Sequence, residues 1–283
     1  MLFKKVKYIR IIAFGVLALI CVLGYQSFAL DNSKNAFAKN EDSSIVLCTW
    51  NIAHYYAYGS AKNVIDGAIY EEKLKAFRAV LYDSINADII TLNEYSSNFG
   101  VDKMRVAHKS AAVLFDKYET KYEGGTTRKG IVHNAMYSNV RVREFKNQPF
   151  EFIKTTKYKK SHRGFCYLAS NVYIDGKKVK LVCVHLIYSK KDPSLVQGQI
   201  SELIEAFKGE DRVVICGDFN TSNYSKFKKA GYTLANDGSI VTFYKTSKPL
   251  DNIITKGVRI SEVRTVKTEL SDHYPLVCRL SID

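Results

Sequence analysis

Short apolar runs that lead into chemically reactive side chains recur along this chain of 283 residues. Four runs have the composition of buried β-strands, at residues 45–48, 89–92, 181–184 and 213–216. Strands usually end in Gly, Asn or Ser, which turn the chain, whereas these lead into metal-ligand and proton-transfer residues. The polar clusters are Trp50-Asn51, Asn93-Glu94, His185, residues 217–220 and Ser271-Asp272-His273, with Asp251 shortly before the last. The pattern predicts one active site assembled from the ends of several strands.

The composition indicates a folded, basic protein. Hydrophobic residues make up 46% of the chain, which is enough for a substantial core and excludes wholesale disorder. The 42 basic and 28 acidic side chains leave a net charge of +14. That balance favours anionic partners, such as nucleic acid, phosphorylated small molecules or an anionic membrane surface. A solubilising excess of charge is the alternative explanation.

The N-terminal residues have the pattern of a targeting segment. A basic head at residues 4–10 precedes an apolar run at residues 11–25 and then Ser27-Phe28-Ala29, which resembles a cleavage site. The run is shorter than the roughly 20 residues of a membrane span, so residues 1–29 are predicted to be a signal peptide, with an N-terminal membrane anchor as the alternative. We therefore expect an exported protein, either secreted or periplasmic, or membrane-anchored.

Residues 30–44 are polar and charged, which predicts a flexible linker. No later stretch rich in Pro, Gly or Ser is long enough to separate two domains, so residues 45–283 are expected to form the functional domain. Its five cysteines all lie in apolar, strand-like runs without a C-x-x-C pair, which predicts buried free thiols and leaves one disulfide as the alternative.

Periodicity predicts several elements. Leu74, Phe77, Leu81 and Ile85 are spaced at three and four, which favours an amphipathic helix over residues 70–85. A second helix is predicted at residues 195–207, and Asp175-Gly176 favours the turn of a hairpin between residues 172–174 and 179–184. Strands interspersed with helices indicate an α/β or α+β domain with large sheets.

Two of the clusters suggest metal chemistry. Glu94 ends an apolar run, where a carboxylate is costly unless it is solvated, paired or bound to a metal. A hard cation such as Mg²⁺ binds oxygen ligands, often one or two carboxylates with substrate phosphate and water. Asn51 offers a neutral oxygen for such an ion, or an amide for a phosphate or a water molecule.

The other clusters suggest proton transfer. Asp218 and Asn220 are two residues apart, so on an extended segment they would face the same side. Asp272-His273 joins an acid to a titratable imidazole, and Asp251 is available to fix the tautomer of that imidazole. His185 ends its own strand and suits general acid catalysis. Each cluster alone is also explained by a turn, a cap or a loop, and their joint occurrence carries the prediction.

The order and residue composition of these motifs resemble those of the endonuclease/exonuclease/phosphatase superfamily, the DNase I-like hydrolases. The resemblance extends from Ile45 to the C-terminus. The matching motifs are Trp50-Asn51, Asn93-Glu94 for the family's Q-E, His185-Leu186, Gly217-Asp218-Phe219-Asn220, Leu250-Asp251-Asn252-Ile253 and Ser271-Asp272-His273-Tyr274-Pro275.

The resemblance implies a four-layer α/β sandwich of two packed mixed β-sheets flanked by helices. It also implies hydrolysis of a phosphoester that depends on Mg²⁺, with Mn²⁺ or Ca²⁺ as alternatives. The implied metal ligands are Glu94, Asn51 and Asp272. The implied catalytic residues are His273 and Asp218 for the attacking water, Asp251 to orient His273, Asn220 and His185 for the phosphoryl oxygens, and His185 as the leaving-group acid.

Three further residues are candidates for substrate binding. Arg163 matches a position where relatives carry Arg-Gly, and its fork would bind a phosphate. Asn134 lies in a segment that resembles the family's G-N-A. Tyr55 can stack on a base or help to cage a choline headgroup, unless it simply packs in the protein.

The sequence predicts the reaction more narrowly than the substrate. A nuclease that holds the nucleic-acid backbone on its basic surface is favoured. A sphingomyelinase-type phosphodiesterase acting on anionic or choline lipid and a phosphatase for small metabolites are the alternatives. A catalytically silent binding module on the same fold is a remote alternative, because every core motif position is present. No protein partner is indicated.

Overall fold

The computed structural model describes residues 43–58, 67–96, 111–124, 133–158 and 165–282. The predicted leader and nearly all of the predicted linker lie outside these ranges. Within them, no helix is both long enough and apolar enough to cross a membrane.

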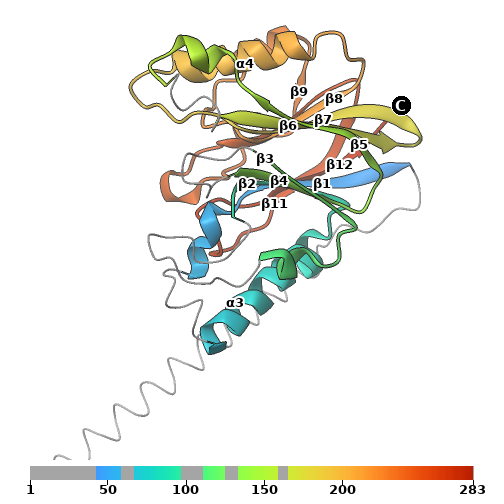
Figure 1. The fold of residues 1–283 in the computed structure, drawn as a ribbon, viewed down its shortest axis with the longest axis vertical. Helices are drawn as coiled ribbons and strands as arrows, with labels where there is room; N and C mark the ends of the chain where they lie inside the picture. The colour runs from blue at the N-terminus through green and yellow to red at the C-terminus, as the bar shows by residue number, and fades with distance from the viewer. Residues whose placement is uncertain (1–42, 59–66, 97–110, 125–132, 159–164, 283) are drawn as a thin grey trace, which may run out of the picture.

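Twelve strands form two six-stranded sheets in the described residues (Figure 1). Sheet I has the order β11 (Arg259–Thr265), β12 (Leu276–Ser281), β1 (Ser44–Asn51), β2 (Ile89–Tyr95), β4 (His133–Ser138) and β3 (Thr120–Gly124). Sheet II has the order β5 (Val142–Pro149), β6 (Cys166–Ile174), β7 (Lys177–His185), β8 (Val213–Asp218), β10 (Asp251–Lys256) and β9 (Thr233–Leu234). The pairs β1–β2 and β7–β8 are parallel and the others antiparallel, so both sheets are mixed.

The sheets pack face to face, and helices cover their outer faces. Helix α4 (Ser194–Ala206) lies over sheet II and helix α3 (Gly67–Arg78) lies against sheet I, which gives the four layers seen in Figure 1. The predicted four-layer α/β sandwich is confirmed. Shorter helical segments are η1 (Ala53–Tyr58), η2 (Ala79–Ile85), η3 (Ala111–Phe115), η4 (Phe152–Thr155), α5 (Ser225–Lys229) and η6 (Tyr244–Thr246).

Burial on both faces explains why the strands have continuous apolar runs. Leu47 and Leu276 of sheet I meet Val214 and Cys216 of sheet II in the core between the sheets. On the outer face of sheet I, Trp50 packs in the same core as Phe77 of α3. A strand covered on both sides has no solvent-facing position, so its sequence does not alternate.

The predicted helices and hairpin are confirmed, with one difference. Helix α4 matches the prediction within a residue, and the hairpin of β6 and β7 turns at Asp175 (φ 50°) and Gly176 (φ 69°), both left-handed. The helix predicted over residues 70–85 is divided into α3 and the π-helical segment η2, which ends at Asn86 in the left-handed conformation. The five cysteines of the described residues are free and buried, as predicted.

Candidate active site

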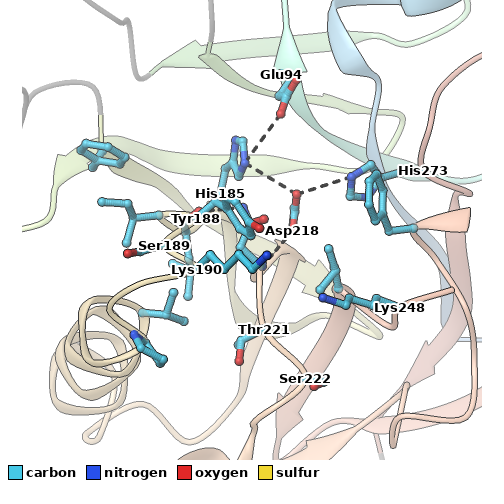
Figure 2. Close-up of a pocket in the computed structure, with 18 of the residues that line it drawn as sticks. Glu94, His185, Tyr188, Ser189, Lys190, Asp218, Thr221, Ser222, Lys248 and His273 are labelled. Carbon is cyan, nitrogen blue, oxygen red and sulfur yellow. Dashed lines mark hydrogen bonds and ion pairs between the residues drawn. The ribbon is translucent and has the colours of Figure 1, made fainter. Parts of the chain in front are cut away.

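The polar clusters meet at one edge of both sheets. In the parallel pair β1–β2, Asn51 is the register partner of Asn93, and Glu94 follows it. In the parallel pair β7–β8, His185 is the register partner of Asp218. Several of these side chains line a single cavity of about 890 Å³ (Figure 2). The predicted assembly of one site from several strand ends is thus what the fold produces.

A buried carboxylate–imidazole pair crosses from one sheet to the other. Asp251 begins β10 opposite Asp218, and its Oδ2 lies 2.7 Å from Nδ1 of His273, in the segment before β12. The backbone N–H of His273 donates to Ser271 Oγ at 3.1 Å, which fixes the approach of the chain. With Nδ1 engaged, Nε2 of His273 points toward Asp218, whose Oδ2 is 3.8 Å away.

The pKa values in this group are displaced by burial and mutual charge. Burial alone would lower the pKa of His273, but the charge and hydrogen bond of Asp251 outweigh it and raise that pKa to about 9. Burial, followed by the negative charge of Asp251, raises the pKa of Asp218. At neutral pH His273 is therefore the cation of the group, and Asp218 is an unusually basic carboxylate.

Glu94 supplies a carboxylate that remains ionised at the cavity wall. Burial raises its pKa, but the hydrogen bond from His54 and the positive charge of His185 lower it to about 2. Its Oε2 lies 3.2 Å from His54 Nε2, and its Oε1 lies 3.9 Å from His185 Nε2. The side chain keeps 29% of its surface exposed, so it is accessible to an ion.

Asn93 joins the two sheets directly behind these carboxylates. Its Oδ1 accepts the backbone N–H of Asp218 at 2.8 Å, and its Nδ2 donates to the carbonyl of Val184, also at 2.8 Å. The residue comes from β2 of sheet I, whereas both partners lie in sheet II. This fully buried amide fixes Glu94, its chain neighbour, relative to Asp218.

Comparison with known proteins gives the fold. No family model matches the chain. The structure of an endonuclease/exonuclease/phosphatase protein from Beutenbergia cavernae superimposes with a TM-score of 0.63 at 17% identity, covering 84% of this chain and 72% of that one. The chain has the endonuclease/exonuclease/phosphatase fold.

Further solved members of this fold are similar. Humanized TDP2 of D. rerio gives a TM-score of 0.60 at 16% identity, over 85% of this chain and all of that one. The human nocturnin catalytic domain with bound sulfate gives a TM-score of 0.60 at 15% identity, over 85% of this chain and 94% of that one. Two curated UPF0294 proteins of Vibrio vulnificus strains are 26% identical over 117 residues, or 38% of this chain. The alignment spans only 41% of the length of those relatives.

Two places in the site have ligand-type side chains suited to a divalent cation. Asp218, Asp251 and His273 each offer a ligand atom within 4.8 Å of the others. However, Asp251 and His273 are hydrogen-bonded to each other, and all three side chains are buried. This arrangement suits proton transfer better than the entry of an ion. Glu94 is the accessible carboxylate and fits the oxygen preference of Mg²⁺ or Mn²⁺. Asp272 lines the same cavity, where its Oδ2 accepts from Lys245 Nζ at 3.1 Å.

Asn51 and Asn220 both have local hydrogen bonds in the site, and Asn220 differs from the prediction in its backbone. Asn51 Oδ1 accepts the N–H of Ala53, and its Nδ2 donates to Glu94 and to Asp218, so its role as a metal ligand stays a prediction. Asn220 is not on an extended segment, because it is left-handed at φ 52° and its N–H donates to Asp218 Oδ1 in a tight turn. Its side chain still lines the cavity.

The three predicted substrate-binding residues lie in different surroundings. For Tyr55 the structure shows the packing alternative, because the side chain is 1% exposed, its ring packs against Phe77 and Tyr95, and its hydroxyl donates to the carbonyl of Ser96. Asn134 lines the cavity, but its Oδ1 accepts from Asn93 and its Nδ2 donates to a backbone carbonyl, so it supports the wall. Arg163 lies outside the described residues.

Sequence reasoning missed several residues of the site. His54 contacts Glu94, and its position three residues after Asn51 was the available signal. Tyr188, Lys190 and Lys248 line the cavity from loops that follow β7 and precede β10. These loops carry no periodic pattern, so only the fold brings them to the site.

Proposed function

We propose that this chain is an exported, divalent-cation-dependent phosphodiesterase that cleaves nucleic acid by in-line attack of an activated water. The observation that carries the proposal is that one cavity combines a carboxylate suited to a cation with a buried group suited to proton transfer. An ionised, accessible carboxylate at Glu94 stands opposite the buried group of Asp218, Asp251 and His273. The fold is that of solved hydrolases, among them a D. rerio TDP2 complexed with single-strand DNA product. Export is supported by the pattern of residues 1–29 alone.

In the proposed reaction, Asp218 takes the proton of the attacking water. Its raised pKa makes it a better base than an ordinary carboxylate. His273, charged at neutral pH and held through Nδ1 by Asp251, presents Nε2 beside it and stabilises negative charge on the phosphoryl group. Asp251 acts by fixing that imidazole.

In the proposed reaction, His185 protonates the leaving oxygen. Its Nε2 lies 3.6 Å from Asp218 Oδ2, and its ring faces the cavity (Figure 2). Glu94, with Asp272 lining the same cavity, would hold the cation. A cation there supplies charge neutralisation to the phosphoryl oxygens during displacement.

The cavity wall favours an extended anionic substrate. Lys190 and Lys248 supply cations, and Tyr188 is 63% exposed, which is unusual for a large aromatic side chain. Lysines suit the phosphates on either side of the scissile bond, and an exposed ring suits base stacking. The net charge of +14 acts in the same direction.

The test is hydrolysis by the full chain, purified in mild detergent. Single-stranded and duplex DNA, RNA, sphingomyelin and a phosphomonoester would each be incubated with Mg²⁺, Mn²⁺ or EDTA. We expect nucleic acid to be cleaved with a divalent cation and not with EDTA. Glu94→Gln and His273→Gln should each reduce kcat by about 10³-fold, while the exposed Glu205→Gln on α4 should not.

Two results would contradict the proposal. Full activity of both site variants on the best substrate would remove the site assignment. Cleavage of sphingomyelin or the phosphomonoester without cleavage of nucleic acid would retain the site and replace the substrate.

A further inference from the structure

His54 contacts the proposed cation ligand but has no part in the proposed proton transfers. It lies in η1, directly after β1, and its side chain is 37% exposed. Its Nε2 is 3.2 Å from Glu94 Oε2, on the opposite carboxylate oxygen from the one that faces His185 and Asn51. Glu94 therefore has a nitrogen donor beside each of its oxygens.

The backbone that brings His54 to this place is strained. Ala53, His54 and Tyr55 have φ angles of 46°, 53° and 60°, three consecutive left-handed residues without a glycine. For L-residues other than glycine, each of these conformations is less favourable than the right-handed one. Such strain persists where the surroundings impose it, and it concentrates at functional positions.

Buried contacts on both sides hold the strained turn. Asn51 Oδ1 accepts the N–H of Ala53 at 3.0 Å, and the N–H of Tyr55 donates to the Ile52 carbonyl at 2.9 Å. The Tyr55 ring is buried, and its hydroxyl reaches the Ser96 carbonyl beyond the end of β2. The turn is therefore locked to the end of β1 and to the end of β2, the strand that carries Glu94, and the imidazole is presented to the carboxylate.

The spacing of the two donors is that of neighbouring ligands on one ion. Ligand atoms about 2.1 Å from a shared cation and about 90–110° apart lie about 3.0–3.4 Å from each other. The 3.2 Å between His54 Nε2 and Glu94 Oε2 falls in that interval. A cation could replace the proton between these atoms without displacing either residue.

We propose that His54 is a nitrogen ligand of the cation bound at Glu94, and that it makes the site prefer Mn²⁺ to Mg²⁺ and Ca²⁺. The inference rests on the cation dependence in the proposed function. Mg²⁺, Ca²⁺ and Mn²⁺ all accept carboxylate ligands, but Mn²⁺ is a first-row transition metal and therefore gains more from an imidazole nitrogen than the two hard cations do. A site with one carboxylate and one imidazole therefore discriminates by ligand chemistry.

The direct test is electron spin-echo envelope modulation of Mn²⁺ bound to the full chain, because it detects ¹⁴N coordinated to the ion. We expect a nitrogen signal that is lost in His54→Asn and retained in His185→Gln. Asn is the chosen replacement because it adopts the left-handed conformation readily, so the turn is not strained further. Thermal unfolding without metal would verify that the variant is folded.

The second readout is metal affinity measured by calorimetry. His54→Asn should weaken Mn²⁺ binding by about 10- to 100-fold while changing Mg²⁺ binding much less. His54→Asp, which substitutes an oxygen ligand, should shift the preference toward Mg²⁺. Absence of a nitrogen signal from the wild-type chain, or a signal and an Mn²⁺ affinity unchanged in His54→Asn, would overturn the proposal.

Neither readout requires hydrolysis, so the two proposals can fail separately. A chain that binds Mn²⁺ through His54 but cleaves no phosphoester would refute the function and retain the ligand. Cleavage of nucleic acid with Mg²⁺ by a chain that gives no nitrogen signal would retain the proposed function and refute His54 as a ligand.

Discussion

At the scale of single residues, Asn93 links the two sheets through two buried hydrogen bonds. It stands where the family that the sequence resembles has Gln, and the carboxylate that follows is unchanged. In the structure it is the amide that fixes sheet I to sheet II beside the site. Neither the spacing nor the residue type indicates this, because both of its sheet II partners are backbone groups about 90 or more residues away along the chain.

Asn93→Ala should therefore affect stability and catalysis together. It removes the side-chain partner of the buried N–H of Asp218 and of the carbonyl of Val184, which we expect to cost roughly 3 kcal/mol in urea unfolding. Displacement of Asp218 should lower kcat by about 10- to 100-fold. The matched control is Asn171→Ala, in which a buried amide on β6 loses its bond to Glu144; it should lose stability alone. An unaltered kcat in Asn93→Ala would argue against a positioning role.

The ion pair of His273 and Asp251 should make stability depend on pH in the alkaline range. The folded-state pKa of about 9 exceeds the ordinary 6.5, so the folded protein binds the proton more tightly. The stabilisation is complete below about pH 6.5 and is lost as the pH rises through 9. Urea midpoints of the EDTA-treated protein should fall between pH 7 and 9.5, and this fall should be reduced in His273→Gln. An equal fall in both proteins would assign it to other groups.

At the scale of elements, several strands, the helices and the Asp175-Gly176 turn were predictable, whereas the turn after β1 was not. Apolar runs and three-four spacing follow from burial, which acts on whole elements, so β1, β8 and α4 were found within a few residues. The turn after β1 depends on three strained residues that no pattern marks. The sequence therefore leaves the stacking and packing roles of Tyr55 both open, and it gives no reason to select His54.

The approach of β7 to β8 gives a prediction for Gly217. A Cβ there would lie 1.9 Å from the carbonyl oxygen of Val184, and its φ of 139° is unfavourable for other residues. Gly217→Ala must therefore push apart the strands that carry His185 and Asp218. We expect a loss of several kcal/mol in unfolding free energy and of most activity. Gly209→Ala, where nothing lies within 4 Å, should change neither.

At the scale of the whole molecule, the net charge of +14 should make the affinity for nucleic acid depend on ionic strength. Binding of a DNA oligonucleotide to the inactive Glu94→Gln protein, measured by fluorescence anisotropy, should weaken steeply as ionic strength rises. Lys190→Ala and Lys248→Ala should each reduce the slope of log Kd against log salt by about one. Lys177→Ala is the control, since it lies at the far end of β7, about 26 Å from His185. Equal slopes in all three variants would mean that the cavity lysines do not contact phosphate.

The two sheets differ in how the chain builds them. Sheet II is one continuous stretch, from β5 to β10, whereas sheet I combines β1 to β4 with β11 and β12, which come after it. The strand between β11 and β1 is β12, and His273 immediately precedes it. A nascent polypeptide on the ribosome therefore lacks both an inner strand and the charged imidazole until residues 259–281 have been made. Under the proposed function, incomplete translation products cannot cut nucleic acid, however well their second sheet has folded.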